Sequence, residues 1–408
     1  MSEIKFVKTS GSKKIYFTTV VITLLVIFLI LFPKGGVKLG GLPLTFGYML
    51  FAVVTMSMLF INIYFGRLFI VSRPQLAVLV AMCAFQLVVS LTLIANGYED
   101  VGYLVALLIS LFFLPIALMY FLMPQIQKLD LDLLLKLIKN SVLAVSIYGI
   151  FLFLYIITTG NYFEIPLLTV NSGDLGQMGE KFNNRGQLVK LFSTYNNGNI
   201  YGVSLLILLP LFCLIENSFL KKLMVKLSLV LTLSRTVWIG LILYEILSFR
   251  SIAKGREIYR LIGIIILGTI IYSSVAFMER DMDFLLDSSL GGRIDHLEFS
   301  PTIISKQTFI SIGEIVPATV LQQFGLVGLL TFLIYMTMPV FVWLVGLVPY
   351  HKSEYKRSLA MGLLIYCIIM FSDGAMNYIP VMMYYWFVVA LLLTKNIPLK
   401  TISRLTLP

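Results

Sequence analysis

The chain has 408 residues, of which 59% are hydrophobic and only 12% are charged, and its formal net charge is +11. A soluble domain keeps about a quarter of its residues charged, so this composition excludes a soluble protein and indicates a polytopic membrane protein. The long Leu, Ile, Val and Phe runs also exclude the alternating pattern of a membrane β-barrel. They favour an all-α fold with transmembrane helices of roughly 20 residues each.

The apolar runs predict about twelve helices. The basic N-terminus leads into the first run without a small-residue cleavage site after it, so we interpret this run as an uncleaved helix. The seventh and eighth runs are short, and the tenth is long enough to be tilted or preceded by a surface turn. In chain order the expected segments are 15–32, 41–64, 75–94, 101–122, 134–158, 198–215, 222–233, 236–249, 258–276, 318–349, 358–377 and 378–394.

The distribution of positive charge predicts the orientation of these helices. If the N-terminus lies in the cytoplasm and the helices alternate, most Lys and Arg residues fall in cytoplasmic segments, as the positive-inside rule requires. The C-terminus then also lies in the cytoplasm. The net charge of +11 is therefore a signal of topology and does not call for nucleic acid as a partner.

Two outer connections are far longer than the others and divide the chain into five parts. Loops of about 40 residues are usually functional or disordered, and neither of these has the composition of a disordered segment. We expect both to fold against the outer mouth of the bundle. The parts are 1–158 with five helices, the loop 159–197, the central helices of 198–276, the loop 277–317 and the three helices of 318–408.

The first outer loop ends in the stretch "NNGN" at 196–199, which favours turns and left-handed backbone. Asn197 or Asn199 is predicted to cap the helix that follows. The cations Lys181, Arg185 and Lys190 come just before it, and amides and cations at a helix N-terminus favour an anion site. A polar turn with a helix cap and no ligand is the alternative.

The stretch "LTLSRTVWIGLIL" at 231–243 places Ser234 and Arg235 between two apolar runs. In the predicted topology this point lies at the outer membrane surface. One interpretation is an arginine that snorkels to the lipid headgroups. The other is that the Arg235 guanidinium binds a lipid-linked phosphate.

The second outer loop begins with an acidic, amphipathic stretch and continues as "GGRIDHLEF" at 291–299. Its glycines let a ligand approach the backbone, and Arg293 offers a forked donor for phosphate. Asp295 and His296 are of the types that accept a proton near neutral pH. The alternative for each residue is a glycine turn with solvated charges.

Several other chemistries lack their sequence motifs. The chain has neither a GxxxxGK[ST] phosphate loop nor a GxGxxG turn, and its two histidines are too few for a His-rich metal site. Asp281 and Asp283 form a bare DxD pair, which is weak evidence for a metal-dependent transferase. Cys83, Cys213 and Cys367 lie far apart in apolar runs, as small buried residues do.

Three stretches resemble motifs of the O-antigen ligase/polymerase superfamily, and most closely the Wzy-type polymerases of capsule, exopolysaccharide and O-antigen synthesis. "FSTYNNGNIYG" at 192–202 resembles the family's Phe…Asn-Pro-Asn…Gly start of a helix, with Gly198 where proline is usual. "LTLSRTVWIGLIL" resembles its Thr-x-Ser-Arg-Ser/Thr motif. "GGRIDHLEF" resembles the opening of its large outer loop.

This resemblance implies a GT-C-like membrane glycosyltransferase of the bacterial cytoplasmic membrane that needs no metal or cofactor and inverts the sugar carbon. It implies transfer of a glycan from an undecaprenyl-diphosphate donor to an acceptor hydroxyl at the outer face. The partners implied are the lipid-linked donor and acceptor, membrane lipid, a chain-length regulator and a flippase. Carried onto this chain, the diphosphate ligands are Arg185, Lys190, Arg235 and Arg293.

The chain departs from the motif pattern of the superfamily at the residue expected to act as general base. Ligases of the superfamily usually have a histidine shortly before the tenth helix, whereas "ISIGEIVPATVLQQFG" at 310–325 has none. This difference favours a polymerase over a ligase. Glu314 is nearest to the expected position, and Asp295 and His296 are the other candidates.

Two further classes stay open. A twelve-helix transporter such as a lipid-oligosaccharide flippase would show two similar halves, and 1–200 and 201–408 show no such repeat. A non-catalytic scaffold would tolerate alanine at Arg185, Arg235 and Arg293 together.

Overall fold

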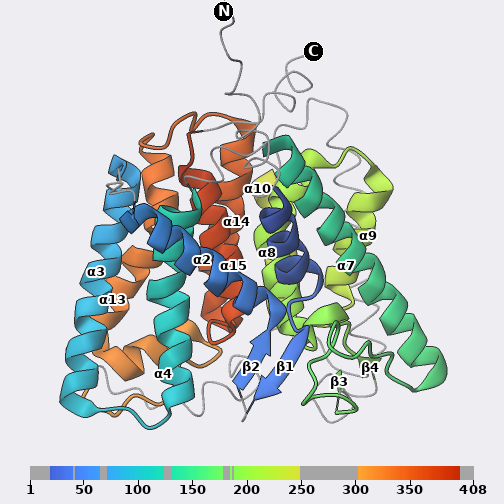
Figure 1. Ribbon diagram of the computed structural model, residues 1–408, viewed down its shortest axis with the longest axis horizontal. Coiled ribbons are helices and arrows are strands. Elements are labelled where there is room, and N and C mark those ends of the chain that lie inside the picture. The colour runs from blue at the N-terminus through green and yellow to red at the C-terminus, as the bar shows by residue number, and fades with distance from the viewer. Residues whose placement is uncertain are drawn as a thin grey trace, which may run out of the picture.

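The computed structural model describes residues 19–39, 42–64, 71–123, 131–177, 184–185, 188–248 and 302–395. These residues are mostly helical. Two short antiparallel hairpins, β1 with β2 and β3 with β4, lie at one end of the helix bundle, at the bottom of Figure 1. We call this the hairpin end and the other the opposite end.

The helices run between these two ends. The first is Thr19–Leu31, whose last part is the π-helix η1 (Ile27–Leu31), and β1 (Gly36–Leu39) and β2 (Leu42–Thr45) follow. The helix Val101–Leu122 consists of α4 (Val101–Leu108), η2 (Ile109–Phe113), α5 (Leu114–Ile116) and η3 (Ala117–Leu122). β3 (Asn184–Arg185), β4 (Leu188–Val189) and the 3-10 turn η4 (Ser193–Tyr195) precede α8. The other helices are α2 (Phe46–Tyr64), α3 (Arg73–Asn96), α7 (Leu131–Thr159), α8 (Gly198–Ile215), α9 (Phe219–Val230), α10 (Arg235–Ser248), α13 (Val316–Leu344), α14 (Glu354–Asp373) and α15 (Ile379–Leu393).

Seven of the described helices are long and apolar enough to cross a membrane: α2, α3, Val101–Leu122, α7, α8, α13 and α14. Thr19–Leu31 and α15 are shorter and also apolar. This supports the expected helical, multi-pass architecture. The count of twelve crossings and their orientation stay predictions, and the expected segment 258–276 lies outside the described residues.

Two predicted helix boundaries were wrong. The expected segment 41–64 loses its first residues because Leu42–Thr45 form β2. The expected segment 318–349 ends at Leu344, since Gly346 adopts a φ of 76° and stops the helix. Gly325 adopts a φ of 75° inside α13 and splits it into two helical parts. A Cβ at Gly325 would lie 2.7 Å from the Ile303 carbonyl oxygen, so the preceding segment packs into the kink.

α8 is the most buried of the seven long helices, and α14, α15, α10 and α7 pack against it. At Gly362 of α14 the two backbones meet, because a Cβ there would lie only 2.1 Å from the Ile207 carbonyl oxygen. Small residues at such contacts are typical of membrane helices, where close packing replaces the hydrophobic effect as the driving force. The position of α8 is thus fixed by direct contact with its neighbours.

Backbone hydrogen bonds join connections of the hairpin end that are far apart in sequence. The Ser172 N–H donates to the Gly36 oxygen at 3.2 Å, and the Glu99 N–H donates to the Phe309 oxygen at 2.9 Å. The described part of the first long loop therefore packs against the start of β1. The segment that precedes α13 packs against the turn between α3 and α4.

At the opposite end, a buried lysine caps a helix. The Lys356 side chain, in the first turn of α14, is fully buried. Its ammonium donates to the carbonyl oxygens of Leu391, Leu392 and Thr394 at 2.8, 2.9 and 2.8 Å. These carbonyls at the end of α15 would otherwise lack partners, so the lysine ties the C-terminal end of α15 to α14.

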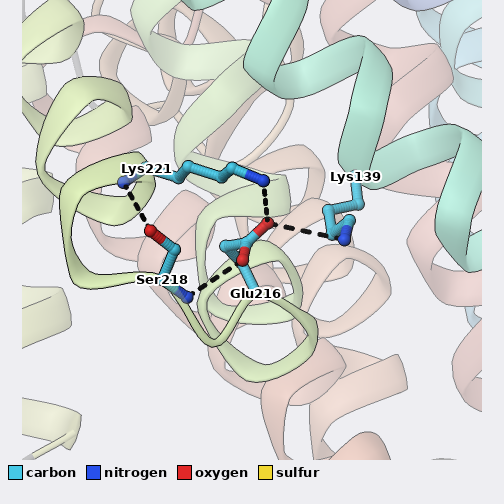
Figure 2. A network of polar contacts seen from close by, with 4 residues as sticks. All are labelled: Lys139, Glu216, Ser218 and Lys221. Carbon is cyan, nitrogen blue, oxygen red and sulfur yellow. Dashed lines mark hydrogen bonds and ion pairs between the residues drawn. The ribbon is translucent and has the colours of Figure 1, made fainter.

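A second polar network lies where α8 turns into α9, and Figure 2 shows its four residues. Glu216 is only 5% exposed, and its carboxylate lies 3.4 Å from the Lys139 ammonium and 3.8 Å from that of Lys221. The Ser218 N–H donates to the same carboxylate at 2.9 Å. Burial alone would raise the pKa of Glu216, but the Ser218 N–H and the two ammonium groups outweigh it, so this pKa lies below its ordinary value.

The Glu216 network predicts a pH-dependent stability. Because the pKa of Glu216 is lower in the folded state, its stabilisation is present above the ordinary carboxyl pKa of about 4.3 and is lost as the pH falls through the folded pKa. We expect Glu216→Gln to reduce stability by about 1 kcal/mol at pH 7 and by less at pH 3. Thermal unfolding of the purified protein at both pH values measures this.

The control is Glu99→Gln, since Glu99 is an exposed acid at the hairpin end and should give wild-type curves at both pH values. An equal loss of stability for Glu216→Gln at pH 3 and pH 7 would contradict the ion-pair account.

Candidate functional site

The turn before α8 has the left-handed backbone that its sequence predicts. Ser193 and Asn196 have φ values of 52° and 59°, and Asn197 returns to an extended conformation. The Asn197 Oδ1 accepts hydrogen bonds from the N–H groups of Asn199 at 2.8 Å and Ile200 at 3.2 Å. This confirms the predicted cap and assigns it to Asn197.

The turn between α9 and α10, 231–234, packs directly against the turn before α8. The Leu191 N–H donates to the Leu231 oxygen at 2.9 Å. A Cβ at Gly198 would lie 2.8 Å from the Leu191 oxygen and 3.4 Å from both the Lys190 Cβ and the Thr232 oxygen. The absence of a side chain at Gly198 thus permits this close approach. It also places Lys190 beside the turn that leads to Arg235.

Arg235 is the first residue of α10 and is only 7% exposed. Its neighbour Thr236 shares a hydrogen bond of 2.9 Å with the Ser372 hydroxyl at the end of α14. The Trp238 indole N–H donates to the Val230 oxygen at 2.9 Å and closes the α9–α10 turn. This burial disfavours the interpretation of Arg235 as a snorkelling arginine, because such a side chain would extend to the headgroups.

The end of α14 brings a buried acid to the same place. Asp373 is 2% exposed, and its Oδ2 accepts a hydrogen bond of 2.7 Å from the Asn199 amide. The next N–H, of Gly374, donates to the Glu314 carbonyl oxygen at 2.9 Å. The first turn of α8, the start of α10, the end of α14 and the residues before α13 therefore meet at the hairpin end.

The pKa of Tyr378 reflects the negative charges in this region. The pKa of Tyr378, in the turn before α15, is raised by burial and then by the negative charges of Asp373 and Glu314. The Lys34 ammonium lies 5.8 Å from the centre of the Tyr378 ring. Two carboxylates, a phenol and an ammonium group thus surround the end of α14.

Unusual backbone conformations concentrate in these turns. Six of the described residues other than glycine have a positive φ, and four of them lie in the three turns that meet here: Ser193, Asn196, Leu233 and Ala375. Such conformations cost of order 1 kcal/mol or more each and cluster at functional sites, because surrounding contacts must hold them. Their clustering supports a functional site at this end.

Two buried oxygens near the α8 N-terminus have no hydrogen-bond partner among the described residues. They are the Thr194 Oγ1, in a residue that is 1% exposed, and the Asn199 Oδ1. A buried polar atom without a partner costs roughly 1–3 kcal/mol. A polar ligand at this point would remove that cost.

The structure places the predicted site residues to different extents. Lys190 is half-buried, and its Cβ lies at the contact around Gly198 together with Thr232, three residues before Arg235. Glu314 is exposed and joins the site through its backbone. Arg185 lies in β3, where the structure describes its backbone.

Arg293, Asp295 and His296 lie outside the described residues. The expected meeting of the guanidinium groups of Arg185, Arg235 and Arg293 therefore stays a prediction.

No role was predicted for Asp373, whose buried carboxylate accepts hydrogen bonds from the Asn199 amide and the Ala375 N–H. An acid in an apolar helix is rare and is usually functional, and that was the available signal.

Comparison of the chain with protein-family models, with curated proteins and with solved structures finds no match. The fold and the site define a mostly helical protein with long apolar helices and a polar site at one end of its bundle. Any assignment of activity therefore depends on the site residues and on the motifs quoted above.

The cap of α8 provides a direct test of the site's local structure. We expect Asn197→Ala to lower stability by about 1 kcal/mol, because the N–H groups of Asn199 and Ile200 lose their acceptor. Asn197→Gly is the matched variant and should cost only a few tenths of a kcal/mol, since glycine is tolerated at N-caps. Thermal unfolding in detergent measures both, and equal values for the two variants would argue against the cap.

Proposed function

We propose that the chain is a polysaccharide polymerase that joins undecaprenyl-diphosphate-linked oligosaccharide repeat units at the outer face of a bacterial cytoplasmic membrane. In this proposal the hairpin end faces outward and both termini lie in the cytoplasm. The lysines near the opposite end, among them Lys139, Lys221 and Lys356, support this orientation, because basic residues are enriched on the cytoplasmic side.

The observation that carries the proposal is the packing of the turn that leads to Arg235 against Lys190 and the N-terminus of α8. The N–H groups of Asn199 and Ile200 bind the Asn197 cap, so the helix N-terminus contributes its partial positive charge to an anion, and the two cations add to that charge. The unpartnered oxygens of Thr194 and Asn199 add acceptor atoms at the same point. Together these groups suit a diphosphate that carries a sugar with hydroxyl donors.

The reaction assigned to this site is a single inverting displacement. The acceptor hydroxyl oxygen attacks the anomeric carbon of the donor, and the bond from that carbon to the diphosphate oxygen breaks. The electron pair leaves with the undecaprenyl diphosphate, whose charge Lys190, Arg235 and the α8 N-terminus stabilise. A carboxylate takes the acceptor proton.

Glu314 fits the role of base better than Asp373. Its side chain is exposed at the hairpin end, where an acceptor glycan can reach it. The Asp373 carboxylate is buried and accepts hydrogen bonds from the Asn199 amide and the Ala375 N–H. We assign Asp373 the role of positioning Asn199 at the start of α8.

Substitution of Arg235 tests the phosphate role. In liposomes supplied with an undecaprenyl-diphosphate repeat unit, we expect the wild type to give a ladder of products on a gel. Arg235→Gln should lower the rate at least about 100-fold through loss of transition-state charge stabilisation, and Arg235→Lys should lower it less. Arg73→Gln, at an exposed arginine of the opposite end, is the matched control and should keep the wild-type rate.

The products of the wild type separate the alternatives. Transfer of a single unit to a different acceptor would indicate a ligase, and movement of the lipid across the membrane without a new bond would indicate a flippase. A wild-type rate for Arg235→Gln would refute the phosphate role.

Substitution of Glu314 tests the assignment of the base. We expect Glu314→Gln to slow ladder formation by about 100-fold or more and to leave the affinity for undecaprenyl diphosphate unchanged, since the base acts only on the acceptor. Glu99→Gln, at another exposed acid of the hairpin end, serves as the control. If Glu314→Gln polymerises at the wild-type rate, the base is another residue, and Asp295 and His296 become the candidates.

A further inference from the structure

An apolar cavity of about 60 Å³ lies between four elements of the bundle. The helix Thr19–Leu31 lines one side of the cavity with the side chains of one helix face, those at positions 22, 25, 26, 29 and 30. Phe51 of α2, Leu118 of η3 and Met383 of α15 are among the residues that line the other sides. Apart from the phenol of Tyr384, whose hydroxyl donates to the Leu29 oxygen, the lining side chains are hydrocarbon or thioether, so the cavity offers little to a water molecule.

The cavity is extended along the helix that lines it. Its lining runs from residue 22 to residue 30 of this helix, over the α-helical part and into the π-helix η1. All the elements around the cavity are apolar helices of the kind that span membranes. In a bilayer, the molecules that can enter the cavity from outside are therefore lipid hydrocarbon chains. Its length and its chemistry both suit a stretch of hydrocarbon chain.

Two of the lining elements, η1 and η3, are π-helices where they border the cavity. π-turns within α-helices occur frequently at functional sites. In η1 the carbonyls of Leu29 and Ile30 accept hydrogen bonds from tyrosine hydroxyls: Tyr384 donates to Leu29 at 3.0 Å, and Tyr195 donates to Ile30 at 3.1 Å. These bonds hold the π-turn in place.

The same two tyrosines connect the cavity to the candidate site. Tyr384 lines the cavity, and its hydroxyl lies next to that of Tyr195. Tyr195 is the last residue of η4 and precedes Asn197, the cap of α8, by two residues. The tyrosine pair therefore links the lining of the apolar cavity to the turn that carries the cap of α8.

We propose that this cavity holds part of the isoprenoid chain of the lipid whose phosphate binds at the N-terminus of α8. This inference rests on the proposed function, which supplies the phosphate end of the ligand. The chain enters the cavity beside Tyr384 and packs against the face of Thr19–Leu31. The cavity thus selects a lipid by its chain, independently of the glycan that the lipid carries.

Binding of undecaprenyl phosphate and of the short-chain geranyl phosphate, measured by native mass spectrometry of the full chain, tests the inference. Val26→Phe and Leu118→Phe fill the cavity from two different helices, at residues that are 5% and 2% exposed. We expect each to weaken undecaprenyl phosphate binding about 10-fold and to leave geranyl phosphate binding unchanged. Val20→Phe is the matched control, since Val20 lies on the same helix and is 55% exposed.

The thermal unfolding midpoint of Val26→Phe and Leu118→Phe is measured in parallel. The result is read from the variant whose midpoint equals that of the wild type, because its fold is intact. Unchanged binding of undecaprenyl phosphate by that variant would overturn the inference. Equal competition by phosphatidylglycerol would also overturn it, because the cavity would then accept any membrane lipid.

Arg235→Gln in the same assay separates this inference from the proposed function. If it weakens the binding of both phosphates while the cavity variants change nothing, the phosphate site stands and the cavity inference fails. If only the cavity variants weaken undecaprenyl phosphate binding, the chain site stands and the proposed place of the phosphate fails.

Discussion

The arrangement of the hairpin end depends on the hydrogen bond between the Asn199 amide and the buried Asp373 carboxylate. A carboxylate in an apolar bundle is stable only when it is paired or hydrogen-bonded, so the first turn of α8 and the end of α14 must stay together. The Leu191–Leu231 hydrogen bond adds the α9–α10 turn, and the Glu314–Gly374 bond adds the start of α13. Three turns with left-handed residues are thereby held around one helix N-terminus.

The opposite end makes this arrangement rigid. Lys356 binds the last carbonyls of α15, and Glu216 gathers Lys139 and Lys221 around the corner between α8 and α9. Between the two ends α8 is in direct contact with its neighbours, most closely at Gly362. A central helix that is fixed at both ends and along its length gives a preorganised position to the proposed anion site at its N-terminus, as binding of a charged ligand requires.

Hydropathy predicted the long helices, because a segment that spans lipid must be apolar over its whole length. The Asn-rich turn predicted a cap at Asn197 or Asn199, and the structure assigns it to Asn197. The role of Asp373 could not be predicted, since an acid at a helix end has the same local sequence whether it is solvated or bonded to a distant amide. The burial of Arg235 depends on contacts across the bundle. The Gly325 kink and the π-turn η1 depend on Ile303 and on two tyrosine hydroxyls that come from other parts of the chain.

The central claim is that one end of the bundle binds a lipid-linked diphosphate through Lys190, Arg235 and the N-terminus of α8. A cryo-electron microscopy map of the protein with undecaprenyl diphosphate bound tests it most directly. The account predicts diphosphate density against the Arg235 guanidinium and the first turn of α8. Density for the diphosphate at the opposite end, near Glu216 and Lys221, or at a point remote from Arg235, would contradict it.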